Sequence, residues 1–319
     1  MATQTLATAS TASPLTAADP HRFPDLPAFP TDIQTAPLHR PTYRNFVALR
    51  KSLKGEQLLN EANQFFDLGP KLYDLRREEL QKYDYKNRGS YIEYKGFGNA
   101  VVDEHGNLDW NEFYNMTFST FHPTPFSHPQ VIYDHDELIK SYIKHSHALV
   151  TTILSHLNTH LHLPPNTLQK LHRLTSPSGD QIRVIKSPPQ PVSDRRTALG
   201  KHTDFGSITL LFNRLGGLQI LPPPSLTLED HKPQWTYVKP IPSHCIVNHG
   251  DSMVKFTRGV LRSNIHRVVS PPGEQACHTR YSVFYFSRAN DEVILKGLGR
   301  GDVILRAKDG EEESINSKD

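Results

Sequence analysis

Apolar residues change their spacing along the chain, and this change separates a helical first part from a β-rich second part. From about Tyr43 onward, leucines and phenylalanines recur every three or four positions, which is the period of a helix buried on one face. Two helices are expected before Tyr83. The longest helical pattern covers residues 134–163, and Pro164 and Pro165 end it.

From Gln181 the pattern changes to short apolar or alternating runs separated by glycine and proline turns. Runs of this length and spacing are typical of a β-sandwich or a β-barrel. We therefore expect a mainly β core with flanking helices, preceded by an α-helical N-terminal region. The expected strands are 181–187, 207–213, 217–221, 235–239, 244–248, 252–256, 265–269 and 279–287.

Composition at the two ends of the chain sets the outer boundaries of this arrangement. Residues 1–42 begin with an Ala/Thr/Ser-rich stretch and continue with regularly spaced prolines, which predicts a strap that is disordered and then extended. Residues 43–175 are expected to form the helical region that packs on the core, and residues 176–300 the β core. Residues 301–319 are charged and are expected to form a tail.

Charge and cysteine content exclude several classes of function. The 319 residues include 36 Lys and Arg and 33 Asp and Glu, without a basic run, so no nucleic-acid partner is expected. No apolar stretch is long enough to cross a membrane. Cys245 and Cys277 cannot build a disulfide framework, and no targeting signal is evident at the start, so we expect a cytoplasmic protein with reduced thiols.

A metal site is indicated by His202 and Asp204, which flank Thr203. Side chains at positions i and i+2 of an extended chain share a face, so both can reach one ion. His266, on a later expected strand, supplies a third ligand. Two imidazoles and one carboxylate are the facial triad that holds ferrous iron and leaves the opposite positions open for oxygen and substrate.

A carboxylate-binding pair follows on the strand expected at residues 279–287. Arg280 and Ser282 share a face, and a guanidinium fork beside a hydroxyl matches a carboxylate. We therefore expect an acidic cosubstrate that chelates the iron. Phe284 and Phe286 lie on the same face, where they either pack in the core or contact substrate. Lys186 either attracts an anionic substrate or is a solvated strand lysine.

Six segments of the chain follow one another in an informative order: 202–204, 207–211, 216–220, 247–251, 266–268 and 280–282. Together they resemble the iron(II)/2-oxoglutarate-dependent oxygenases, in the branch similar to isopenicillin N synthase. Residues 281–290 look most similar to fungal members that modify secondary metabolites. The resemblance implies a double-stranded β-helix, or jelly roll. It also implies oxidation of a small molecule by iron(II) and O2, coupled to decarboxylation of 2-oxoglutarate, and it allows stimulation by ascorbate.

The resemblance also assigns roles to residues outside the metal site. Arg280 and Ser282 would bind the far carboxylate of 2-oxoglutarate. Ser187 stands where some 2-oxoglutarate users carry a tyrosine that contacts this cosubstrate, so the hydroxyl is kept on a shorter side chain. Phe286 matches a position that stacks on substrate in similar enzymes, and Phe284 lies beside it. The reaction would be a hydroxylation, a desaturation or a ring rearrangement.

Other functions stay open on the sequence alone. An iron(II) oxidase that does not use 2-oxoglutarate would bind the carboxylate of its substrate with Arg280. A jelly roll of the same shape could bind a small molecule without catalysis. A zinc hydrolase is the least supported alternative. A structural zinc site is disfavoured as well, because structural zinc prefers four nitrogen or sulfur ligands.

Two further expectations concern the surface of the protein. His156, His160 and His162 lie at the end of a helical pattern and are expected to be solvated or to cap the helix rather than to bind metal. The strand and helix that relatives place before the first long helix are not found. An edge of the larger sheet is therefore expected either to be uncovered or to be covered by the strap or by a second subunit in a homodimer.

Overall fold

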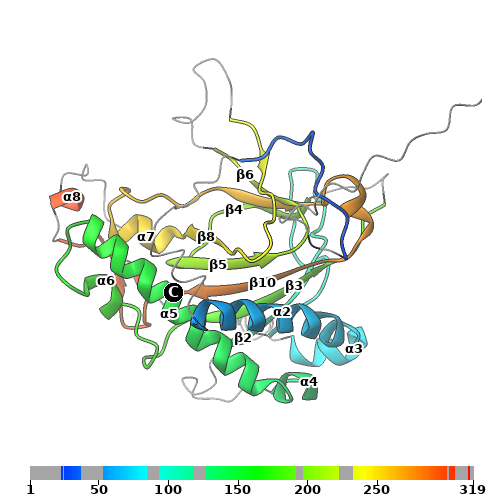
Figure 1. The fold of residues 1–319 in the computed structure, drawn as a ribbon, viewed down its shortest axis with the longest axis horizontal. Helices are drawn as coiled ribbons and strands as arrows, with labels where there is room; N and C mark the ends of the chain where they lie inside the picture. The colour runs from blue at the N-terminus through cyan, green and yellow to red at the C-terminus, as the bar shows by residue number, and fades with distance from the viewer. Residues whose placement is uncertain are drawn as a thin grey trace, which may run out of the picture.

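The fold consists of two β-sheets that pack against each other, with helices over the outer face of the larger sheet (Figure 1). No helix in the described ranges is long and apolar enough to cross a membrane. The computed structural model describes residues 23, 25–36, 53–84, 93–117, 127–191, 197–222, 233–299, 302–305 and 315–316.

The larger sheet is antiparallel and has six strands in the order β1-β2-β3-β10-β5-β8. Alternate residues of its strands therefore face either the helices or the smaller sheet. Its strands are β1 Glu93–Lys95, β2 Glu112–Thr117, β3 Gln181–Ser187, β5 Ile208–Asn213, β8 Ile246–His249 and β10 Arg280–Ser287.

The smaller sheet has four strands in the order β4-β9-β6-β7. A separate pair of short strands, β11 and β12, lies outside both sheets. The strands of the smaller sheet and of this pair are β4 Thr197–His202, β6 Leu218–Ile220, β7 Thr236–Tyr237, β9 His266–Val269, β11 Ile294–Leu295 and β12 Ile315–Asn316.

Helices α2 and α5 cover one face of the larger sheet, below it in Figure 1. Phe65 of α2 and Tyr142 of α5 are fully buried and meet edge-to-face, with ring centroids 4.8 Å apart. Val283 and Tyr285 of β10 point into the same core. The helices are α2 Leu53–Tyr73, α3 Arg77–Leu80, α4 Gln130–Tyr133, α5 Asp136–His160, α6 Thr167–Lys170, α7 Asp251–Phe256 and α8 Asp302–Leu305.

A second, smaller apolar core occupies part of the space between the two sheets. Leu211 of the larger sheet packs there with Leu218 and Val268 of the smaller one. Phe284 of β10 belongs to this side, opposite to its neighbours Val283 and Tyr285. The period of two in β10 thus separates residues for the helical core from residues for the space between the sheets.

The structure differs from the sequence-based expectations in three places. Residues 252–256, expected as a strand, form most of helix α7, with Met253 and Phe256 buried on one side. Residues 43–175 are not helical throughout, because β1 and β2 add two strands to the larger sheet. Strand β4 was not expected.

The described part of the strap, residues 25–36, covers an edge of the smaller sheet rather than the larger one. Thr35 pairs in parallel with Tyr237 of the edge strand β7, and the amide of Ala36 donates to the Tyr237 carbonyl at 2.8 Å. The disorder expected at the start of the chain lies outside the described residues. So does most of the expected tail.

Candidate metal centre and cavity

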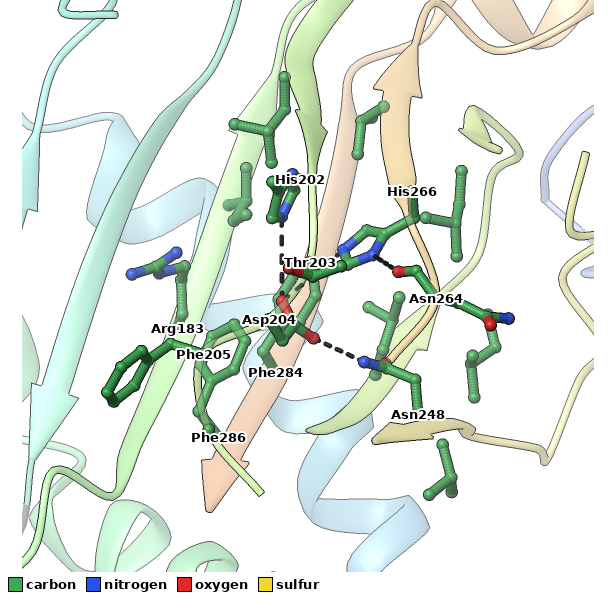
Figure 2. Close-up of a pocket in the computed structure, with 18 of the residues that line it drawn as sticks. Arg183, His202, Thr203, Asp204, Phe205, Asn248, Asn264, His266, Phe284 and Phe286 are labelled. Atoms are coloured by element: carbon green, nitrogen blue, oxygen red, sulfur yellow. Dashed lines mark hydrogen bonds and ion pairs between the residues drawn. The ribbon is translucent and has the colours of Figure 1, made fainter. Parts of the chain in front are cut away.

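A cavity of about 270 Å³ lies between the two sheets, and polar residues gather on one of its walls (Figure 2). Strands of both sheets contribute to its lining. Phe284 and Phe286 of β10 also line the cavity, and their rings stack in parallel, with centroids 5.3 Å apart and planes inclined by 6°. His202, Asp204 and His266 line the same cavity.

His202, Asp204 and His266 converge on one point. His202 ends β4 and lies opposite His266, which begins β9, so the ladder between these strands brings the two imidazoles together. Each Nε2 atom faces Asp204 Oδ1, at 3.8 Å for His202 and 3.6 Å for His266. In the described part of the chain, this is the one group of three or more histidine, cysteine or acidic side chains whose ligand atoms can share a metal, all within 4.8 Å.

The backbone fixes the tautomer of both histidines. His202 Nδ1 lies 2.8 Å from the Gly200 carbonyl oxygen, and His266 Nδ1 lies 3.0 Å from the Asn264 carbonyl oxygen. A carbonyl only accepts, so each Nδ1 carries the hydrogen and each Nε2 keeps its lone pair. Burial lowers the pKa of His202, and the neighbouring His266 lowers it further, which favours the neutral form that binds metals.

Asp204 is held by two donors from the larger sheet. Thr209 Oγ1 and Asn248 Nδ2 donate to Asp204 Oδ2 at 2.7 and 2.6 Å. Thr209 and Asn248 lie opposite each other in the β5–β8 ladder, so both side chains reach the same oxygen. The other oxygen, Oδ1, is the one that faces the two imidazoles.

Asp251, at the start of α7, connects the two segments that carry the ligands. Its carboxylate accepts from Thr203 Oγ1 at 2.8 Å and from Ser263 Oγ, three residues before His266. Its backbone amide donates to the Asp204 carbonyl at 2.7 Å. The positions of the ligands therefore depend on both sheets and on the first turn of α7.

Arg280 lies in the cavity wall with 2% of its surface exposed. Its Nε donates to the Gly216 carbonyl at 2.8 Å, whereas its Nη2 has no hydrogen-bond partner. The hydroxyls of Ser187, opposite Arg280 in the β3–β10 ladder, and of Ser282 are also buried without a partner. Burial lowers the pKa of Arg280 to about 10. This value is still well above neutral pH, so the guanidinium stays cationic. Buried polar groups without partners are rare, and this set fits a bound carboxylate.

Comparison with known proteins agrees with this geometry. The profile of the 2OG-Fe(II) oxygenase superfamily matches residues 178–289. A 2-oxoglutarate-dependent dioxygenase of Aspergillus fumigatus is 30% identical over 264 residues, which cover 77% of this chain and 68% of that protein. The UPF0676 protein C1494.01 of Schizosaccharomyces pombe is 32% identical over 260 residues, 77% of this chain and 76% of that protein. The chain belongs to the 2OG-Fe(II) oxygenase superfamily.

A solved structure supports the fold of this oxygenase. A full-length Neurospora crassa protein in complex with alpha-KG superposes with a TM-score of 0.67 and 21% sequence identity, over 81% of this chain and 80% of that one. The two sheets are thus the sheets of a jelly roll. The expected family, enzyme class and cofactors, iron(II) and 2-oxoglutarate, are confirmed.

Arg183 is a cavity residue of the oxygenase to which the sequence assigned no role. Its guanidinium lies over the Phe113 ring at 4.1 Å and the Phe286 ring at 5.0 Å, and its Nε donates to Asn115 Oδ1 at 2.7 Å. Burial, together with repulsion from Arg288, lowers the pKa of Arg183 to about 10. Within the described residues no carboxylate pairs with it.

Lys186 lies outside the cavity, so its placement does not favour the suggestion that it attracts substrate. Lys186 lies one position out of phase with Arg183 and Ile185, which line the cavity, so it points to the other side of β3. There its Nζ pairs with Glu112 Oε1 at 3.0 Å and lies over the Tyr73 ring. Because side chains alternate along β3, Arg183 faces the cavity and Lys186 faces the opposite side of the sheet.

The remaining histidine and cysteine expectations concern residues away from the cavity. His156, His160 and His162 are exposed at and just beyond the end of α5 and do not belong to the ligand group. Cys245 and Cys277 are both free thiols, and Cys277 is exposed.

Proposed function

We propose that this oxygenase binds iron(II) through His202, Asp204 and His266 and oxidises a small organic molecule in the adjoining cavity. The observation that carries the proposal is the convergence of the three ligand atoms within 4.8 Å at the cavity wall. When bound, iron(II) and 2-oxoglutarate would activate O2: one oxygen atom would enter succinate as 2-oxoglutarate loses carbon dioxide, and the other would be used to oxidise the substrate. We place the reaction in fungal secondary metabolism, as the resemblance of residues 281–290 implies, and the fungal relative named a 2-oxoglutarate-dependent dioxygenase is consistent with this.

Arg280 binds the far carboxylate of 2-oxoglutarate in this proposal, and Ser187 and Ser282 add hydroxyl donors. The support is chemical: one guanidinium nitrogen, Arg280 Nη2, and two buried hydroxyls lack partners at neighbouring positions of β3 and β10. A carboxylate satisfies all three, because it accepts several hydrogen bonds and neutralises the guanidinium.

The substrate side of the cavity favours a flat or apolar body with at least one acceptor group. Phe284 and Phe286 offer a stacked aromatic wall, and Phe205 is also part of the lining. Arg183, held between two rings, offers donors beside that wall. Such a site orients one C–H bond of the substrate toward the metal, and this choice decides between hydroxylation, desaturation and ring rearrangement.

The function is tested by comparing metabolites of a host that makes the wild-type chain with those of a host that makes His202→Ala. We expect one precursor to accumulate in the variant and one oxidised product to be lost. The purified protein should then convert that precursor with iron(II) and 2-oxoglutarate and form one succinate per product. Turnover without succinate would instead indicate the oxidase, and ligand binding without oxygen uptake would indicate a binding protein.

The role of Arg280 is tested by Arg280→Gln in the same assay. Loss of a charged hydrogen bond should raise the KM for 2-oxoglutarate about 10- to 100-fold, with a smaller effect on the KM for the substrate. Glu274→Gln, an exposed change nearby, is the control. An unchanged requirement for 2-oxoglutarate would mean that Arg280 does not bind this cosubstrate.

A homodimer remains a prediction. The strap pairs with β7, so it leaves the edge strands of the larger sheet, β1 and β8, without a strand partner from the described strap residues. An uncovered sheet edge favours pairing with a second subunit, and β8 is the edge this prediction uses, because Glu93 of β1 already bridges to Asp84. Light scattering of the purified protein checks this expectation.

A further inference from the structure

We propose that the N-terminal strap and Gln275 position Arg280 for the cosubstrate, through the backbone of Gly216. This inference rests on the proposed function, because it assumes that Arg280 binds 2-oxoglutarate. It makes Gln275 a positioning residue, and it gives residues 25–36 a role in cosubstrate binding in addition to covering a sheet edge.

A continuous series of hydrogen bonds connects the strap with Arg280. Gln275 Nε2 donates to the Pro27 carbonyl at 2.8 Å, and Gln275 Oε1 accepts from the Gly216 amide at 2.9 Å. The Gly216 carbonyl in turn accepts from Arg280 Nε at 2.8 Å. Gln275 and Arg280 are 3% and 2% exposed, so water does not compete for these bonds.

Packing holds Gly216 in the same place. A Cβ atom at Gly216 would lie 2.8 Å from the Phe29 ring of the strap and 2.9 Å from Pro272, so only glycine fits between them. Phe29 is buried and meets Tyr237 edge-to-face at 6.1 Å. The strap therefore packs, through Phe29, against Gly216, whose carbonyl accepts the hydrogen bond from Arg280. In Figure 1 the blue strap runs beside the orange segment that joins β9 to β10, in agreement with the hydrogen bond from Gln275 to Pro27.

The hydrogen bond from Arg280 to Gly216 decides which way the guanidinium fork is turned. Nε is occupied by the Gly216 carbonyl, and the Nη2 atom is left without a partner. Any movement of Gly216 turns the fork and changes the distance between Arg280 and the metal ligands. A cosubstrate that binds at both ends is sensitive to this distance, because each end must be in place for the other to bind well.

The test uses the full-length protein loaded with Mn(II) and measures the binding of 2-oxoglutarate by calorimetry, without turnover. Gln275→Met keeps the size of the side chain and removes both hydrogen bonds, and Phe29→Ala removes the strap packing. Each should weaken 2-oxoglutarate binding about five- to tenfold, the effect of losing roughly one hydrogen bond, while Mn(II) affinity in the absence of 2-oxoglutarate is unchanged.

A second readout separates positioning from general loss of stability. 2-Oxoadipate is longer than 2-oxoglutarate by one methylene group. The affinity for 2-oxoglutarate divided by the affinity for 2-oxoadipate therefore reports the distance between the metal and Arg280. We expect this ratio to fall in Gln275→Met and to stay at the wild-type value in Leu154→Ala, which removes a buried side chain of α5 far from the cavity.

The outcomes are distinct. Wild-type binding of both acids by Gln275→Met and Phe29→Ala would overturn the inference. The inference would also fail if Gln275→Met and Phe29→Ala lost Mn(II) binding together with 2-oxoglutarate binding. It would fail as well if the affinity ratio fell equally in Leu154→Ala. If Arg280→Gln itself binds 2-oxoglutarate like the wild type, the proposed role of Arg280 fails, and the inference fails with it.

Discussion

The carboxylate of Asp204 is the most constrained single group in the site. Both of its donors, Thr209 and Asn248, bind Oδ2, so Oδ1 alone faces the two imidazoles. An aspartate held in this way offers one oxygen to a metal. A facial triad with a one-oxygen carboxylate leaves the opposite positions of an octahedral ion for a chelating acid and for oxygen.

This arrangement predicts that the donors contribute to metal affinity. Thr209→Val and Asn248→Leu keep approximate size and remove a donor, and each should weaken Mn(II) binding roughly 10- to 100-fold, as outer-shell changes do. Thr209→Ser keeps the hydroxyl and should keep most of the affinity. Electron paramagnetic resonance titration of free Mn(II) measures the change. Equal losses in Thr209→Ser and Thr209→Val would contradict the explanation.

The metal ligands could be predicted from the sequence, whereas their supporting donors could not. His202 and Asp204 are two positions apart, and this spacing alone puts them on one side. The roles of Thr209 and Asn248 depend instead on the register of β5 and β8, which pairs these two residues. Both lie in segments that the sequence singled out, but no local pattern states which residue of one strand faces which residue of another.

At the scale of elements, helix α7 shows where an apolar run misleads. Residues 252–256 contain Met253 and Phe256, and a short apolar run is compatible with a strand or with a helix. In the structure this run is helical, with Asp251 in the first turn and Met253 and Phe256 on the buried side. Asp251 can bind Thr203 and Ser263 because the helix begins there.

A buried histidine connects the end of α6 with the residue that precedes β5. Just after α6, His172 Nδ1 lies 2.8 Å from the Leu168 carbonyl oxygen, and its Nε2 lies 2.7 Å from Ser207 Oγ. The neutral ring satisfies both contacts, since Nδ1 donates and Nε2 accepts from the hydroxyl. Burial lowers the pKa of His172 to about 4.

Stability should therefore fall in acid because of His172. In the unfolded chain a histidine titrates near pH 6.5, so between about pH 6.5 and pH 4 only the unfolded state binds this proton. The free energy of unfolding should decrease as pH falls through this window, by up to about 3 kcal/mol from this group. Urea unfolding at several pH values measures it. The curve of His172→Gln should be flatter than the wild-type curve, and parallel curves would exclude His172 as the cause.

At the scale of the whole molecule, the metal site joins the two sheets. His202 and His266 belong to β4 and β9 of the smaller sheet. Asp204 is held instead by Thr209 and Asn248 of the larger sheet. An ion bound by all three side chains therefore connects sheets that otherwise meet through a small apolar core.

Metal binding should consequently stabilise the entire fold. At a Mn(II) concentration 100 times the Kd, mass action adds about 2.7 kcal/mol, which for a chain of this length raises Tm by roughly 4–5 °C. Hydrogen exchange should slow in β8 and in β9 together, because the ion holds one sheet to the other. His202→Ala should lose both effects, while His156→Ala, which changes an exposed histidine of α5, should keep them. An equal rise in Tm for His202→Ala and the wild type would place the ion elsewhere, and protection limited to β9 would show that the ion does not bridge the sheets.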